Sequence, residues 1–184
     1  MKQIPNLLVI GGTGRNIGKT TLTTMIIERF SKELKLIALK TSMLMPDEAY
    51  FHGHHKLIGA DEFELLEEKE IKGNKDSQRY LKAGASQSWF LSAGENAVDS
   101  GMDVFWQKIG FAKPVIAESN VLNDFYIPGL FIMVKGNRQI KPQAKVLLQK
   151  ADVVVSEMDL DGFDSVVKNL DFINGQWFLK DITQ

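Results

Sequence analysis

The 184-residue sequence contains no cysteine. This absence excludes disulfide bonds, cysteine nucleophiles and thiolate metal sites, and it agrees with a reducing compartment. A strong excess of one charge is also missing, since 22 lysines and arginines balance 23 aspartates and glutamates for a net charge of −1. We therefore expect no partner that a global charge bias would attract, neither nucleic acid nor a membrane.

Long apolar runs are missing as well. The first six residues are followed only by a short apolar run at residues 7–10, which is too brief for a signal-peptide core or a membrane span. The sequence shows no repeat, low-complexity tract or linker, and its length is usual for one domain. We therefore expect a single domain over residues 1–184, located in the cytoplasm.

Strand-like and helix-like segments alternate along the chain. This order predicts an α/β fold with three layers, in which helices cover both faces of a mostly parallel sheet. Residues 62–68 fit either a strand or a helix. We predict strands at residues 7–10, 34–39, 87–91, 114–117, 130–134, 152–155 and 176–179, the last of them at an edge, and helices at residues 21–30, 77–84, 95–109, 142–150 and 164–172.

The most informative segment is the glycine-rich loop, residues 11–21, between the first predicted strand and the first predicted helix. Such a loop ending in Gly-Lys-Thr is typical of a phosphate-binding loop (P-loop), in which backbone N–H groups and the positive end of the helix converge on an anion. Lys19 would reach the outer phosphates and Thr20 would ligate Mg²⁺. The predicted nucleotide contacts are Gly12, Thr13, Gly14, Arg15, Asn16, Ile17, Gly18, Lys19, Thr20 and Thr21.

The spacing of the loop differs from the common G-x-x-x-x-G-K-[ST] pattern. That pattern places its first glycine at position 13, where this chain has Thr13, flanked by Gly12 and Gly14. We therefore expect a loop that is one residue longer, or differently bent. The simpler alternative is a glycine-rich turn that carries a surface lysine.

Residues just after the predicted strands should lie together, because ligands bind at the carboxyl ends of strands in such sheets. Glu118 could hold Mg²⁺ or its waters, and Lys40 could stabilise phosphate charge. Asp159 occupies the place where guanine-specific proteins carry an aspartate that bonds the base. The alternatives are solvated strand ends for Glu118 and Lys40 and a plain turn for Asp159.

Two further groups of side chains have open interpretations. Asp76 and Arg79 could approach the γ-phosphate or a second substrate, although Asp76 is also a natural helix N-cap. The histidines of the loop after the second strand fit a metal site with Asp47 and Glu48, contacts to an anionic ligand, or a solvated loop. These histidines are His52, His54 and His55.

The predicted chemistry is phosphoryl chemistry on a nucleoside triphosphate, either GTP or ATP. Lys19, the loop amides and Mg²⁺ at Thr20 would neutralise charge on the β- and γ-phosphates. Glu118 would orient a magnesium-bound water or the attacking group. The predicted catalytic residues are Lys19, Glu118 and Asp76, and the predicted metal ligands are Thr20 and Glu118.

The chain resembles the molybdopterin-guanine dinucleotide biosynthesis protein B group, P-loop proteins related to the signal-recognition and MinD (SIMIBI) class. The resemblance lies in Gly18-Lys19-Thr20-Thr21-Leu22, in Lys40, in the histidines that follow it, in residues 73–79 with Ala83-Gly84-Ala85, and in Glu118. It implies a GTP-binding, slowly hydrolysing protein that assists attachment of a guanine nucleotide to molybdopterin. It also implies a nucleotidyltransferase partner and a homodimer.

Residues 12–20 are also similar to the loop of dethiobiotin synthetase, which uses ATP to close a ring through a carbamate phosphate. An ATP-dependent small-molecule kinase or ligase is therefore the second hypothesis. The third is a nucleotide-gated switch, in which bound nucleotide orders residues 42–60 for a protein partner.

Overall fold

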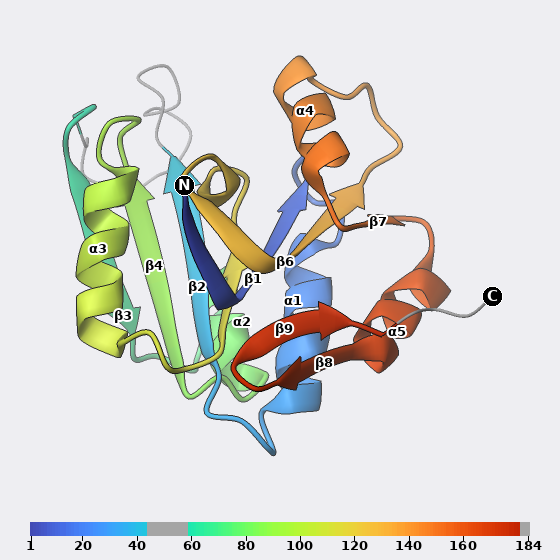
Figure 1. Ribbon diagram of the computed structural model, residues 1–184, viewed down its shortest axis with the longest axis horizontal. Coiled ribbons are helices and arrows are strands. Elements are labelled where there is room, and N and C mark those ends of the chain that lie inside the picture. The colour runs from blue at the N-terminus through green and yellow to red at the C-terminus, as the bar shows by residue number, and fades with distance from the viewer. Residues whose placement is uncertain (44–58, 181–184) are drawn as a thin grey trace.

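A computed structural model describes residues 1–43 and 59–180 of the chain. Within these residues, a seven-stranded, mostly parallel sheet is flanked by helices (Figure 1), which confirms the predicted α/β arrangement. No helix in the described ranges is long and apolar enough to cross a membrane. The helices are α1 (Lys19–Phe30), α2 (Asp76–Lys82), α3 (Val98–Ile109), α4 (Pro142–Lys150) and α5 (Leu160–Asn169), with a 3-10 turn η2 (Leu122–Asp124).

The strand order of the sheet is β3-β4-β2-β5-β1-β6-β7. Neighbouring strands pair in parallel except β3 with β4, which pair antiparallel at one edge. The strands are β1 (Lys2–Gly12), β2 (Ile37–Met43), β3 (Phe63–Glu68), β4 (Gln87–Ala93), β5 (Val115–Glu118), β6 (Tyr126–Lys135) and β7 (Val153–Ser156). A separate hairpin consists of β8 (Leu170–Ile173) and β9 (Gln176–Leu179).

The core lies on both faces of the sheet, because successive strand residues point to opposite sides. In β1, Leu7 and Val9 belong to the cluster formed with α3 and α4, whereas Leu8 and Ile10 belong to the cluster formed with α1, α2 and α5. The central strands are therefore apolar on both faces, as a covered parallel sheet requires. The polar residues Lys40 and Glu118 lie near the carboxyl ends of β2 and β5, where the candidate site lies.

The C-terminal elements differ from the prediction. The helix expected at residues 164–172 ends at Asn169, and the next four residues form β8 instead. Asn174 and Gly175 both have positive φ angles, 53° and 79°, as a two-residue hairpin turn requires. The final strand therefore pairs with β8 rather than with the sheet, and Trp177 anchors it by donating to Asn6 O at 3.0 Å.

Smaller differences concern element boundaries and one ambiguous segment. Of the ambiguous residues 62–68, all but the first form the edge strand β3 (Phe63–Glu68), and none forms a helix. The second strand begins at Ile37 rather than at residue 34, because the N–H of Leu34 still bonds to Phe30 O at the end of α1. Helix α1 begins at Lys19, two residues before the predicted start.

Candidate functional site

A cavity of about 1170 Å³ opens over the ends of the central strands and the beginning of α2. Its wall brings together segments that lie far apart in the sequence: the glycine-rich loop, the end of β2, β3, β4 and the residues after β5. Of the predicted site residues, the cavity is lined by Arg15, Asn16, Ile17, Gly18, Lys19, Thr20, Thr21, Lys40, Asp76 and Glu118.

The glycine-rich loop leaves β1 at Gly12 and enters α1 at Lys19. Gly18 occupies the N-cap with a left-handed φ of 92°, a conformation that glycine adopts without strain. A Cβ at this position would also lie 3.0 Å from the ring of Phe163. Among the described residues no side chain caps α1, so its first N–H groups are suited to bind an anion.

The Asn120 side chain and the backbone of Val134 and Gly136 fix the first residues of the loop. Asn120 accepts from the Gly12 N–H at 2.7 Å and donates back to Gly12 O at 3.0 Å. The Thr13 hydroxyl accepts from the Gly136 N–H at 2.8 Å, and the Thr13 N–H bonds to Val134 O at 3.0 Å. Gly12 and Thr13 thus anchor the loop, and together with Gly14 they lie outside the cavity lining as the described residues define it.

Glu118 is the buried acceptor at the centre of the site, with 2% of its surface exposed. Its Oε2 accepts from the Thr20 hydroxyl at 2.9 Å and from the Tyr80 hydroxyl at 2.6 Å, and its Oε1 forms an ion pair with Lys40. A buried carboxylate is stable only when it is paired and hydrogen-bonded. The structure thus joins Glu118, Thr20 and Lys40, which sequence reasoning had nominated separately.

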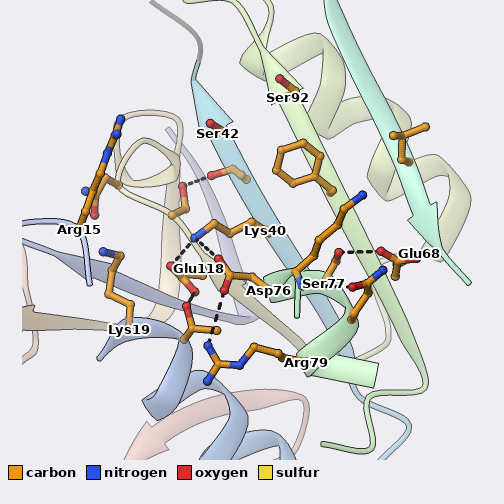
Figure 2. A pocket seen from close by; sticks show the side chains of 18 of the residues that line it. Arg15, Lys19, Lys40, Ser42, Glu68, Asp76, Ser77, Arg79, Ser92 and Glu118 are labelled. Atoms are coloured by element: carbon orange, nitrogen blue, oxygen red, sulfur yellow. Dashed lines mark hydrogen bonds and ion pairs between the residues drawn. The ribbon is translucent and has the colours of Figure 1, made fainter. Parts of the chain in front are cut away.

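Lys40 lies between two carboxylates, as Figure 2 shows. Besides Glu118 it contacts Asp76, with Nζ 3.2 Å from Oδ2, and Asp76 Oδ1 is 3.8 Å from Arg79 Nη1. Asp76 is the first residue of α2, and Lys75 occupies the N-cap position. The alternative interpretation of Asp76 as the N-cap is therefore wrong, and its carboxylate faces the cavity instead.

Burial shifts the pKa of two groups in the site. It lowers the pKa of Lys19 below 10.5, although the nearby Glu118 carboxylate opposes this shift. Burial, followed by the charge of Glu118, raises the pKa of the Tyr80 hydroxyl well above 10. The Tyr80 hydroxyl is therefore protonated at neutral pH and donates to Glu118.

Other predicted residues have different positions. Asp159 caps α5, because its Oδ1 accepts from the Gly162 N–H at 2.7 Å. It is not among the described residues that line the cavity. The segment after β7 is thus a turn, closed by the Asp159 N–H bonding to Ser156 O at 3.1 Å, that leads into α5, as the simpler alternative predicted. The histidines and the acidic residues next to them lie outside the described residues: His52, His54, His55, Asp47 and Glu48.

Comparison of the chain with models of protein families, with curated proteins and with solved structures gives no match. The functional interpretation therefore depends on the residues and the geometry of the site.

Sequence reasoning missed Tyr80 as a site residue, and it placed Asn120 among the strand-end residues without assigning it a role. Tyr80 follows Asp76 by four positions, so both side chains lie on the same face of α2. That spacing could have indicated Tyr80 once Asp76 was placed next to Lys40. Asn120 follows β5 by two residues and carried a weaker signal, because nothing in the sequence shows that β5 lies beside β1.

Tyr80→Phe is expected to lower the free energy of unfolding by about 1.5–3 kcal/mol, the usual contribution of a hydrogen bond to a charged group. The substitution removes the donor to Glu118 and keeps the buried ring. Tyr126→Phe is the matched control, because its hydroxyl is 3.5 Å from Asp99 Oδ1, at the limit of a hydrogen bond. Equal losses for both variants in urea unfolding would contradict the role of Tyr80.

Proposed function

We propose that this protein binds a nucleoside triphosphate, GTP or ATP, together with Mg²⁺ and hydrolyses it slowly, as a P-loop NTPase. The observation that carries the proposal is the Thr20 hydroxyl 2.9 Å from the Glu118 carboxylate, directly behind an uncapped helix start that carries Lys19. A hydroxyl and a carboxylate at the beginning of a helix are the oxygen ligands that a Mg²⁺–phosphate complex uses.

The donor set fits Mg²⁺ rather than a softer metal. Thr20 Oγ1 and Glu118 Oε2 are hard oxygen donors in contact with each other, and Mg²⁺ commonly takes one or two protein oxygens plus phosphate and water. When bound, Mg²⁺ would withdraw negative charge from the phosphate groups. Thr20 and Glu118 would hold it, while Tyr80 and Lys40 keep the carboxylate oriented.

Lys19 supplies the positive charge that is expected to change its hydrogen-bond acceptor when phosphate binds. Its Nζ donates to Gly14 O across the loop. The ammonium group therefore lies beside the loop N–H groups that would bind phosphate. Phosphate oxygens are stronger acceptors for an ammonium group than a carbonyl oxygen. Lys19 is therefore expected to exchange Gly14 O for the β- and γ-phosphates when the nucleotide binds.

Lys40, held in place by Asp76, supplies the positive charge that would face the γ-phosphate. Lys40 Nζ is held 3.2 Å from Asp76 Oδ2 and also pairs with Glu118, which fixes a cation beside the metal ligand. A fixed cation costs no reorganisation when negative charge develops on the phosphoryl group. Asp76 would act by positioning Lys40, and Arg79 adds a second cation at the same wall.

The biological role is proposed from the resemblance described above. In this role the protein is a cytoplasmic accessory protein in molybdopterin-guanine dinucleotide synthesis, with a nucleotidyltransferase partner and as a possible homodimer. The size of the cavity favours the alternative of a small-molecule kinase or ligase, because about 1170 Å³ exceeds the roughly 300–1,000 Å³ of most single-ligand pockets.

The deciding experiment compares the melting temperature of the wild-type protein with GTP and with ATP, each with Mg²⁺ and with EDTA. At a free concentration 100 times the dissociation constant, the nucleotide should stabilise the fold by about 2.7 kcal/mol, which is about 5–10 °C for a chain of this size. The larger shift identifies the preferred base, and EDTA should remove most of it. No shift with either nucleotide at millimolar concentration would refute the proposal.

Nucleotide affinity is expected to fall as the pH rises through the lowered pKa of free Lys19. Bound phosphate favours the charged ammonium group, so the complex has a higher pKa than the free protein and binding takes up protons between the two values. Calorimetry in buffers of different ionisation enthalpy between pH 7 and pH 10 measures this uptake. The groups that affect Lys19 in the free protein are Glu118, Lys40, Asp76 and Arg15. Proton release on binding would contradict this role of Lys19.

A further inference from the structure

The register of the sheet places unlike side chains in one row across the floor of the cavity. Glu118 on β5 is level with Lys40 on β2, Lys40 with Phe90 on β4, and Phe90 with Leu66 on β3. Level residues on neighbouring strands point to the same face. The floor therefore changes from charged to apolar within the width of two strands, at the step from Lys40 to Phe90.

A second row lies two residues further along the strands. Ser42 on β2 is level with Ser92 on β4, so both hydroxyl groups lie on the same face as Lys40 and Phe90. We call the part of the cavity lined by Ser42, Leu66, Phe90 and Ser92 the outer arm. Figure 2 shows Ser42 and Ser92 on adjacent strands, further along the strands than Lys40.

Ser92 carries the strongest sign of a missing ligand. It lines the cavity, only 1% of its surface is exposed, and within the described part of the chain its Oγ has no hydrogen-bond partner. A buried hydroxyl without a partner costs free energy unless something binds it. A ligand in the outer arm with a hydroxyl or carbonyl oxygen would provide that partner.

The nucleotide itself would not fill the outer arm. Thr20 and Glu118 would hold Mg²⁺, and Lys40 contacts the same carboxylate, so the terminal phosphate of the nucleotide would face Lys40. The nucleoside is attached at the opposite, α-phosphate end. The outer arm lies beyond Lys40, past the γ-phosphate, which is where a second small molecule would meet the terminal phosphate.

The lysines nearest the outer arm already have carboxylate partners. Lys40 is held by Glu118 and Asp76, and Lys69 is 2.6 Å from Glu67. An anionic ligand would need a cation without such a partner. The apolar surface of Phe90 and Leu66 suits a flat ring instead.

We propose that the outer arm binds a second small molecule, an uncharged aromatic compound that carries a hydroxyl group, with its oxygen at Ser92 and its ring over Phe90 and Leu66. This inference rests on the proposed function only in assigning the compound to the γ-phosphate side of a nucleotide. The site itself is built from residues that the proposed nucleotide contacts do not include.

The test is a titration of benzyl alcohol followed through the methyl signals of Leu66 in protein with ¹³C-labelled leucine, assigned with Leu66→Ile. Saturable shifts are expected with benzyl alcohol, and smaller ones with benzoate and with benzylamine, which match its shape and carry charge. Ser92→Ala should weaken binding about fivefold, the equivalent of one ordinary hydrogen bond. Ser88→Ala is the matched control, because Ser88 is also buried without a hydrogen-bond partner among the described residues but lies outside the cavity wall that they form.

Several results would overturn the inference: no shift of Leu66 with benzyl alcohol, equal binding of the charged analogues, or equal weakening by Ser88→Ala. The titration is then repeated with Mg²⁺ and a saturating non-hydrolysable analogue of GTP or ATP. Retained binding supports the inference, whereas displacement of benzyl alcohol would identify the outer arm as the base pocket. Failure of the analogue to bind would refute the proposed function alone, because the first titration contains no nucleotide.

Discussion

Lys40→Met is expected to lower the free energy of unfolding by about 3 kcal/mol. Removal of one partner from a buried ion pair typically costs about 3–5 kcal/mol because the remaining charge is left unpaired. The lower value applies because the Lys40 side chain is 21% exposed, so water can reach part of the vacated space. Urea unfolding measures the loss, which corresponds to a decrease of about 6–12 °C in melting temperature.

Two further variants identify the source of the loss. Lys69→Met breaks the ion pair with Glu67 in a lysine that is 73% exposed, and it should cost at most about 1 kcal/mol. Combining Lys40→Met with Glu118→Gln removes the orphaned charge and should recover much of the stability, because the glutamine oxygen still accepts from Thr20 and Tyr80. A loss for Lys40→Met no larger than for Lys69→Met would contradict the buried pair.

Lys19→Ala is expected to abolish the stabilisation of the protein by Mg²⁺ and nucleotide. The wild type should gain about 2.7 kcal/mol at 100 times its dissociation constant, and the variant should show almost none of this gain at the same concentration. The reason is that the Lys19 ammonium group is expected to bind the β- and γ-phosphates directly, whereas Lys40 is already paired with Glu118 and Asp76 and cannot replace it. Differential scanning fluorimetry with a nucleotide titration measures the effect.

The matched control for this prediction is Lys145→Ala in α4, because Lys145 is exposed and is not among the residues that line the cavity. This variant should keep the full nucleotide response. The nucleotide-free Lys19→Ala protein should melt no lower than the wild type, because the removed cation is one whose charged form burial disfavours. Retained nucleotide stabilisation in Lys19→Ala would show that the glycine-rich loop is not the phosphate site.

The sequence allowed prediction of the parts of this site that depend on local order along the chain. The glycine-rich loop lies between a strand and a helix, as its Gly-Lys-Thr ending indicates. Lys40 and Glu118 each follow an apolar segment, and parallel strands end at the same edge. Their placement at one edge of the sheet therefore followed from the prediction, whereas their direct contact also depends on β2 lying beside β5.

Features that depend on register could not be predicted in this way. The step from Lys40 to Phe90 across the cavity floor requires that residue 40 be level with residue 90, and no local pattern contains that offset. The C-terminal hairpin is a different case, since Asn174-Gly175 is a strong turn signal. The prediction nevertheless extended the helix to residue 172, so the residues that form β8 were assigned to it.

The central position of β1 has a consequence for the order in which the protein is completed during synthesis. β1 lies between β5 and β6, and the glycine-rich loop is tied to Asn120 and Val134. Those partners are translated more than a hundred residues after the loop. Contacts of such long sequence separation form late, so the earliest-translated functional segment is among the last to take its final shape, and a nascent chain ending before residue 120 would lack the partners that shape it.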